Sequence, residues 1–202
     1  MSKKWIAEVV RWAERIALLL MSGSVIWRLL PQFSLHPQVV LVLASELAAV
    51  FFLLIQRKGT WSSNFYTTAI AFLGTGAALC VYPIGVEVAP VWVTFPLITV
   101  GTTITLFAKL SLRRSFGLIP ANRGVKVGGA YRFVRHPMYT GYVMNHIGFL
   151  LVFFSAWNVC VYALTWVLLY LRAIEEEKFL LQDPQYVDYA SKVKARMIPG
   201  LV

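Results

Sequence analysis

Long apolar stretches alternate with short polar segments along this chain. A membrane-spanning helix needs about 20 mostly apolar residues, so the pattern predicts an all-α, polytopic integral membrane helical bundle of about six spans. The predicted spans are 13–30, 39–55, 65–82, 91–110, 139–155 and 157–172. Only Ala156 and its neighbours separate the last two, and we expect these two to form a tight helical hairpin.

The composition supports a membrane protein. Hydrophobic residues make up 58% of the 202 positions and charged residues 14%, whereas a soluble domain carries about 25% charged residues. This excludes a soluble globular domain, a disordered chain and a disulfide-stapled secreted module. Cys80 and Cys160 both lie in apolar stretches. We expect them to be core residues, and we expect no metal site.

Positive charge alternates from one loop to the next and predicts the topology. The N-terminal flank and the loop 111–138 are rich in Lys and Arg and the tail 173–202 is strongly charged, whereas the segments 31–38 and 155–158 carry no charge. By the positive-inside rule, both termini and the loop face the cytoplasm. The net charge of +10 is therefore assigned to membrane lipids rather than to nucleic acid.

The first apolar stretch has a second interpretation, as a signal peptide, and the charges near the N-terminus argue against it. Residues 1–24 resemble a signal peptide in their apolar character. Glu14 and Arg15 stand beside the apolar run, however, and no clear cleavage site follows. We therefore expect a retained span.

Polar residues gather in the loop and the tail, so the sequence divides into a four-span region, 1–110, and a candidate catalytic region, 111–202. The loop ends in the sequence GGAYRFVRHPMYTG, residues 128–141. Gly128 and Gly129 permit a tight turn. Pro137 disfavours helical backbone at His136, so a helix is predicted to begin at Pro137. The free N–H groups at the start of that helix suit an anion such as a carboxylate.

Two further motifs follow the sixth stretch. Arg172 precedes Glu175 and Glu176 by three and four residues, so these side chains share one helix face. These charges either lie on a solvated helix end or, because they stand at a membrane boundary, take part in function. In the tail, Asp183-Pro184 predicts the start of an amphipathic helix over 184–196. That helix would lie on the membrane or cover the loop as a lid.

Together these motifs resemble the isoprenylcysteine carboxyl methyltransferase family, which is related to the phospholipid N-methyltransferases. The resemblance rests on G-x-Y-R-x-x-R-H-P-x-Y-x-G, then R-x-x-E-E-E, then Tyr-x-x-Tyr and Arg-x-x-Pro, within about residues 110–200. It implies S-adenosyl-L-methionine as methyl donor and S-adenosyl-L-homocysteine as product. The loop and the C-terminal helix would form the cofactor pocket.

Carried over position by position, the resemblance also implies the site residues. Arg172 matches an arginine tied to substrate, and Arg172 and Glu176 are expected to be catalytic. The stretch from Arg123 to Lys126 departs from the family pattern. The implied cofactor-binding residues are Arg123, Lys126, Tyr131, Arg135, His136, Pro137, Met138, Tyr139, Glu175 and Glu176.

The implied function is methylation of a lipophilic acceptor, namely the carboxylate of an isoprenylated cysteine or a similar lipid-like acid. The alternatives are a phospholipid amine N-methyltransferase, an NADPH-dependent sterol-type membrane reductase and a non-enzymatic membrane protein. The expected partners are a lipophilic or prenylated acceptor and membrane lipids. The expected location is a prokaryotic plasma membrane with a cytoplasmic site, or the ER membrane in a eukaryote.

Overall fold

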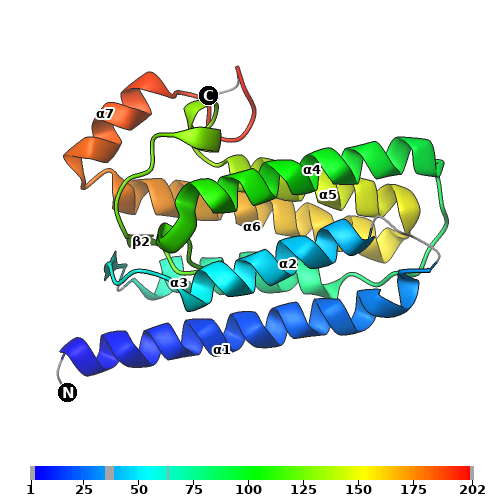
Figure 1. Ribbon diagram of the computed structural model, residues 1–202, viewed down its shortest axis with the longest axis horizontal. Coiled ribbons are helices and arrows are strands. Elements are labelled where there is room, and N and C mark those ends of the chain that lie inside the picture. Colours follow the sequence, from blue (N-terminus) through cyan, green and yellow to red (C-terminus); the bar gives the residue numbers. More distant parts are fainter. Residues whose placement is uncertain (1–2, 35–38, 63, 201–202) are drawn as a thin grey trace.

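The computed structural model describes residues 3–34, 39–62 and 64–200, and the described chain is mostly helical, as predicted (Figure 1). Residues 35–38 of the predicted uncharged loop 31–38 lie outside the described residues. The two short strands are β1 (Thr60–Trp61) and β2 (Ala121–Asn122). The α-helices are α1 (Lys3–Leu29), α2 (Val39–Leu54), α3 (Phe65–Ala77), α4 (Val91–Leu112), α5 (Pro137–Val152), α6 (Ala156–Leu180) and α7 (Pro184–Lys192).

Each of the six predicted spans falls largely within one of the helices α1 to α6. Within the described residues, two helices are long and apolar enough to cross a membrane, Val91–Ser115 and Ala156–Leu180. Two shorter apolar helices cover Val39–Leu54 and Phe65–Cys80. The structure therefore supports two spans by length and composition, and the count of six stays a prediction. The prediction that Cys80 and Cys160 are core residues is wrong, because both side chains are exposed on the bundle.

The predicted hairpin of the fifth and sixth stretches is present, but its helices pack mainly on other partners. α5 packs on α4, and α6 packs on α3. The α4–α5 contact is close because glycines face each other: a Cβ placed on Gly141 would lie 2.6 Å from the Gly101 carbonyl oxygen. Only glycine fits such an approach without displacing backbone. The motif glycine Gly141 thus fixes how deeply α5 sits against α4.

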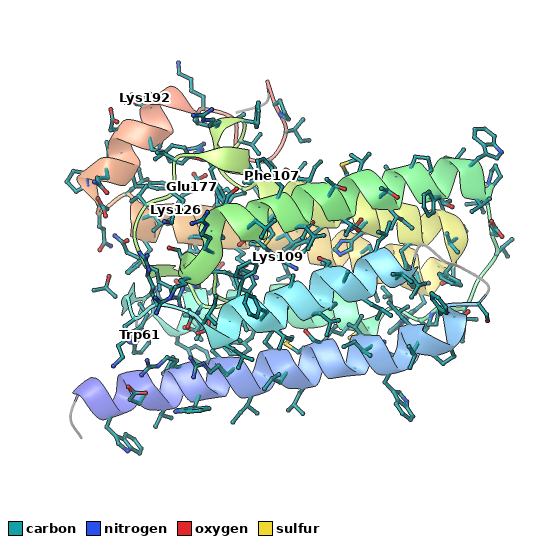
Figure 2. The ribbon with its side chains drawn as sticks, in the orientation of Figure 1. Trp61, Phe107, Lys109, Lys126, Glu177 and Lys192 are labelled. Atoms are coloured by element: carbon teal, nitrogen blue, oxygen red, sulfur yellow. The ribbon has the colours of Figure 1, made fainter. Side chains whose placement is uncertain are left out.

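Polar contacts inside the bundle join the N-terminal helices to α4. Ser22 on α1 donates to Glu46 on α2 over 2.9 Å. Lys109 on α4 is fully buried, and its ammonium donates to the Ser45 carbonyl of α2 over 2.7 Å. Figure 2 shows Lys109 between α4 and α2. Buried charges and carboxylates need such partners, so these contacts fix α1, α2 and α4 relative to one another.

The polar segments gather at one end of the bundle. The antiparallel pair β1–β2, the loop that follows α4 and the helix α7 lie there, beside the beginning of α1 (Figure 1). The helix α6 continues to Leu180, past the predicted end of the span at residue 172, and so carries the acid run into this end. The predicted loop and tail are therefore neighbours in space.

Candidate functional site

The start of α5 has the predicted local geometry. α5 begins at Pro137, and His136 precedes it with a non-helical backbone, φ −127° and ψ 59°. Upstream, Gly129 has φ +63°, and a Cβ there would lie 3.0 Å from the Cβ of Ser111. Only glycine adopts this conformation readily in so small a space. The glycine turn and the proline start together bring Tyr131 and His136 to the same end of the bundle.

The tail covers this helix start, but not as the predicted long helix. Asp183 caps α7 by accepting from the Gln185 amide over 2.9 Å, as predicted. α7 ends at Lys192 rather than at residue 196. Residues 194–197 instead run beside the start of α5: the Arg135 amide donates to the Ala195 carbonyl, and the His136 amide to the Arg196 carbonyl over 2.7 Å. The tail is therefore a strap over the loop.

Glu177 holds the loop and this strap together, although the sequence predicted roles only for its two neighbours. Its side chain is buried, with 4% of the residue exposed. It accepts from His136 Nε2 over 3.0 Å and from Arg196 Nε over 3.1 Å, and Arg135 Nε lies 3.3 Å away. Successive helix residues point about 100° apart. The three consecutive acids therefore point in three different directions, so each has its own partners. This spacing was the sequence signal that could have indicated a role for Glu177 separate from those of its neighbours.

The two predicted acids point in different directions. Glu176 accepts a hydrogen bond from the Tyr139 phenol over 2.8 Å. Glu175 instead pairs with Lys178 over 2.6 Å and accepts from Thr67 on α3 over 3.3 Å. The structure thus brings Glu176 to the motif residues of α5 and places Glu175 against α3.

The ring of Tyr139 lies at the centre of the motif. It stacks on the His136 ring with 5.2 Å between centroids and an interplanar angle of 4°. The Arg172 guanidinium lies 5.4 Å from the centroid of the same ring, a cation–π distance. Arg172 donates to the Thr75 hydroxyl over 2.9 Å and to the Leu118 carbonyl over 2.7 Å. A histidine, a tyrosine and an arginine from three separate motif positions therefore form one stack.

A polar cavity opens at this end of the bundle. Every predicted site residue except Pro137 and Glu175 lines it. Its other walls come from the loop after α4 and from Tyr186 and Tyr189 of α7. Figure 2 shows Lys126 and Glu177 at this end. The predicted residues that line the cavity are Arg123, Lys126, Tyr131, Arg135, His136, Met138, Tyr139, Arg172 and Glu176.

An apolar cavity of about 190 Å³ lies inside the bundle and meets the polar one. It extends from Arg172 to Val81 and Phe153 at the opposite end, between aliphatic and aromatic side chains of α1 to α6. The residues common to the walls of both cavities are Gly117, Leu118, Met138, Tyr139 and Arg172. Tyr139 and Arg172 therefore stand at the junction.

Three buried polar atoms of residues that line these cavities are without a hydrogen-bond partner among the described residues: Arg172 Nε, the Tyr186 hydroxyl and Arg135 Nε, which has only its ion pair with Glu177. Such groups are costly unless a ligand or water satisfies them. Burial raises the pKa of Tyr186, and burial with the nearby Glu176 carboxylate raises the pKa of Tyr131 well above its usual value. Both phenols therefore keep their protons and act as donors at neutral pH.

The fold and these cavities define a class: a helical, membrane-type protein in which a polar cavity and an apolar cavity meet at one junction. Residues 93–182 match the model of the isoprenylcysteine carboxyl methyltransferase (ICMT) family. This match confirms the predicted family for the segment that carries α4, α5 and α6. No curated protein and no solved structure matches the chain.

Proposed function

We propose that this protein is an S-adenosylmethionine-dependent methyltransferase that acts in a membrane on a lipophilic acid, the carboxylate of an isoprenylated cysteine or a similar acceptor. The observation that carries the proposal is the junction of the two cavities at Tyr139 and Arg172. A water-soluble cofactor fits the polar cavity, and a hydrocarbon chain fits the apolar one. The family match supports methyl transfer as the chemistry.

The polar cavity supplies the groups that S-adenosylmethionine requires. When bound, this cofactor supplies an electrophilic methyl group on a sulfonium. Glu176 would accept from its ammonium or ribose hydroxyls, and the unpartnered Tyr186 hydroxyl would donate to it. Lys126 and Arg123 would face its carboxylate, and Tyr131, His136 and Met138 would complete the wall. Pro137 would act by starting α5, and Glu175, which faces Thr67, would act on the cofactor only indirectly.

Arg172 is the proposed acceptor-binding group. Its two terminal nitrogens donate to Thr75 and Leu118, so the guanidinium is held in place while its buried Nε–H is unpartnered. That N–H, with the positive charge, would orient an acceptor carboxylate at the junction. A carboxylate is already a nucleophile and needs no base. An amine acceptor would need one, and Glu176, the carboxylate that lines the polar cavity, already accepts from Tyr139.

Catalysis would come from holding the acceptor carboxylate and the methyl group of the cofactor in the correct relative position. Holding a nucleophile in line with an electrophilic carbon removes much of the entropic cost of a bimolecular reaction. The residue contacts that fix this geometry are the His136–Tyr139–Arg172 stack and the Tyr139–Glu176 hydrogen bond. The strap of residues 194–197 would keep water from the polar cavity. We further propose a multi-pass topology in which this end of the bundle faces the cytoplasm.

Calorimetry with S-adenosylhomocysteine on detergent-purified protein tests the cofactor. We expect wild type to bind, Glu176→Ala to lose binding and Glu175→Ala to bind as wild type. Glu175 is the matched control because it is the adjacent acid on the same helix and lies outside the polar cavity. NADPH should not compete. Binding of NADPH instead would favour the reductase, and no binding to folded wild type would contradict the proposal.

A further inference from the structure

Glu14 of α1 reaches the junction from outside the segment that matches the family. It is 2% exposed, and its Oε1 accepts from the backbone amides of Leu118 and Ile119 over 2.5 and 2.9 Å. Gln56, two residues past the end of α2, lies beside it, with Nε2 3.4 Å from Oε2, and donates to the Phe116 carbonyl over 3.0 Å. One carboxylate thus binds the backbone of residues 118 and 119, which have no strand or helix partner of their own.

The same carboxylate also pairs with a residue that lines the polar cavity. Arg123 Nη2 lies 3.6 Å from Glu14 Oε2, and Arg123 Nη1 donates to the Ile119 carbonyl over 3.3 Å. Both Arg123 and Glu14 are buried, so solvent screens this pair little. Glu14 therefore sets the position of a cation that lines the polar cavity.

Leu118 links this contact to the acceptor side. Its amide binds Glu14, and its carbonyl accepts from Arg172 over 2.7 Å. Leu118 also stands in the walls of both cavities. A shift of the Leu118 backbone would therefore move the Arg172 guanidinium. A displacement of about 1 Å in a positioned group costs about 100-fold in rate.

We infer that Glu14 is a positioning residue for methyl transfer: it fixes Arg123 at the polar cavity and, through Leu118, Arg172 at the junction. A carboxylate at this depth costs free energy unless it is fully hydrogen-bonded. An apolar residue would suffice to pack α1, but it would leave two loop amides without an acceptor. The inference rests on the proposed function for its effect on catalysis, whereas the hold on the loop is independent of it.

Three variants test this inference: Glu14→Ala, Glu14→Gln and the control Glu8→Gln. Glu8 lies on the same helix and is exposed, where it pairs with Arg11 and Lys58. Hydrogen–deuterium exchange of the Leu118 and Ile119 amides should accelerate about tenfold or more in Glu14→Ala. It should stay near the wild-type rate in Glu14→Gln, which keeps an acceptor oxygen, and in Glu8→Gln.

Binding and turnover separate positioning from folding. Glu14→Gln should melt within a few degrees of wild type, yet bind S-adenosylhomocysteine and turn over acceptor about tenfold less well, because Arg123 loses its counter-charge. Wild-type binding and turnover in Glu14→Gln would overturn the positioning role, as would unchanged exchange in Glu14→Ala. If wild type and Glu8→Gln also fail to bind S-adenosylhomocysteine, the proposed function fails, and the exchange rates still decide whether Glu14 holds the loop.

Discussion

The Tyr139 hydroxyl donates to the Glu176 carboxylate across 2.8 Å, joining α5 to α6 at the wall of the polar cavity. α5 and α6 otherwise pack mainly on different helices, α4 and α3. This hydrogen bond therefore aligns two helices that hold opposite sides of the proposed site. It also fixes the carboxylate in one orientation, with its second oxygen available to a ligand.

Tyr139→Phe should weaken S-adenosylhomocysteine binding while the protein stays folded. The variant keeps the ring that stacks on His136 and loses only the hydrogen bond to Glu176. A hydrogen bond to a charged group contributes about 1.5–3 kcal/mol, so we expect a loss of about tenfold in affinity by calorimetry. Tyr142→Phe is the control, since Tyr142 lies one turn further along α5 and lines only the apolar cavity. Equal affinities for both variants would argue against the contact.

Arg172→Lys should impair turnover of the acceptor without weakening cofactor binding. Lysine keeps the charge but cannot bind Thr75 and Leu118 while presenting a further fixed N–H. We expect kcat/KM for an S-farnesylcysteine derivative to fall by about 10- to 100-fold, with S-adenosylhomocysteine affinity near wild type. A variant that loses cofactor affinity as much as turnover would place Arg172 on the cofactor instead.

Filling the apolar cavity should impair only the acceptor. Val42 of α2 lines this cavity, whereas Val40 on the same helix is 43% exposed. Val42→Trp should raise the acceptor KM by about tenfold, because the added ring occupies the space of the hydrocarbon chain. Val40→Trp should leave KM unchanged. Steady-state kinetics at saturating methyl donor measures both, and an unaffected Val42→Trp would place the acceptor chain elsewhere.

Glu177→Gln should release the strap. The substitution removes the charge that faces Arg135, His136 and Arg196 in a buried setting. We expect the free energy of unfolding to fall by about 2 kcal/mol. We also expect faster amide exchange at Arg135 and His136, whose N–H groups donate to the strap carbonyls of Ala195 and Arg196. Lys178→Gln, which breaks an exposed pair with Glu175, should leave stability close to that of wild type, because solvent screens such pairs. Wild-type exchange in Glu177→Gln would show that the strap has other anchors.

The sequence predicted what local patterns determine. The six helical segments follow from runs of apolar residues, and the start of α5 follows from Pro137. The predicted site residues came from the family resemblance that the motifs carry, and the structure brings nine of them to one polar cavity. Glu176 and Arg172 share the cavity because they lie four residues apart on α6.

Contacts between distant segments were not predictable in this way. Glu14 meets Leu118 across more than a hundred positions, and no pattern around either residue indicates the pairing. The end of α7 was wrong for a related reason. Val193 and Met197 fit the helical period, yet Val193 packs against the core where α7 ends and Met197 does so within the non-helical strap. Periodicity alone does not distinguish this arrangement from a longer helix.

The most direct test of the proposed function is transfer of a labelled methyl group. Wild-type protein in lipid vesicles would receive labelled S-adenosylmethionine and an S-farnesylcysteine derivative, with Arg172→Lys beside it. We expect label in the acceptor as a methyl ester, released as methanol by mild base, and about 10- to 100-fold less in Arg172→Lys. A base-stable product, or no labelled acceptor from protein that binds S-adenosylhomocysteine, would contradict carboxyl methylation.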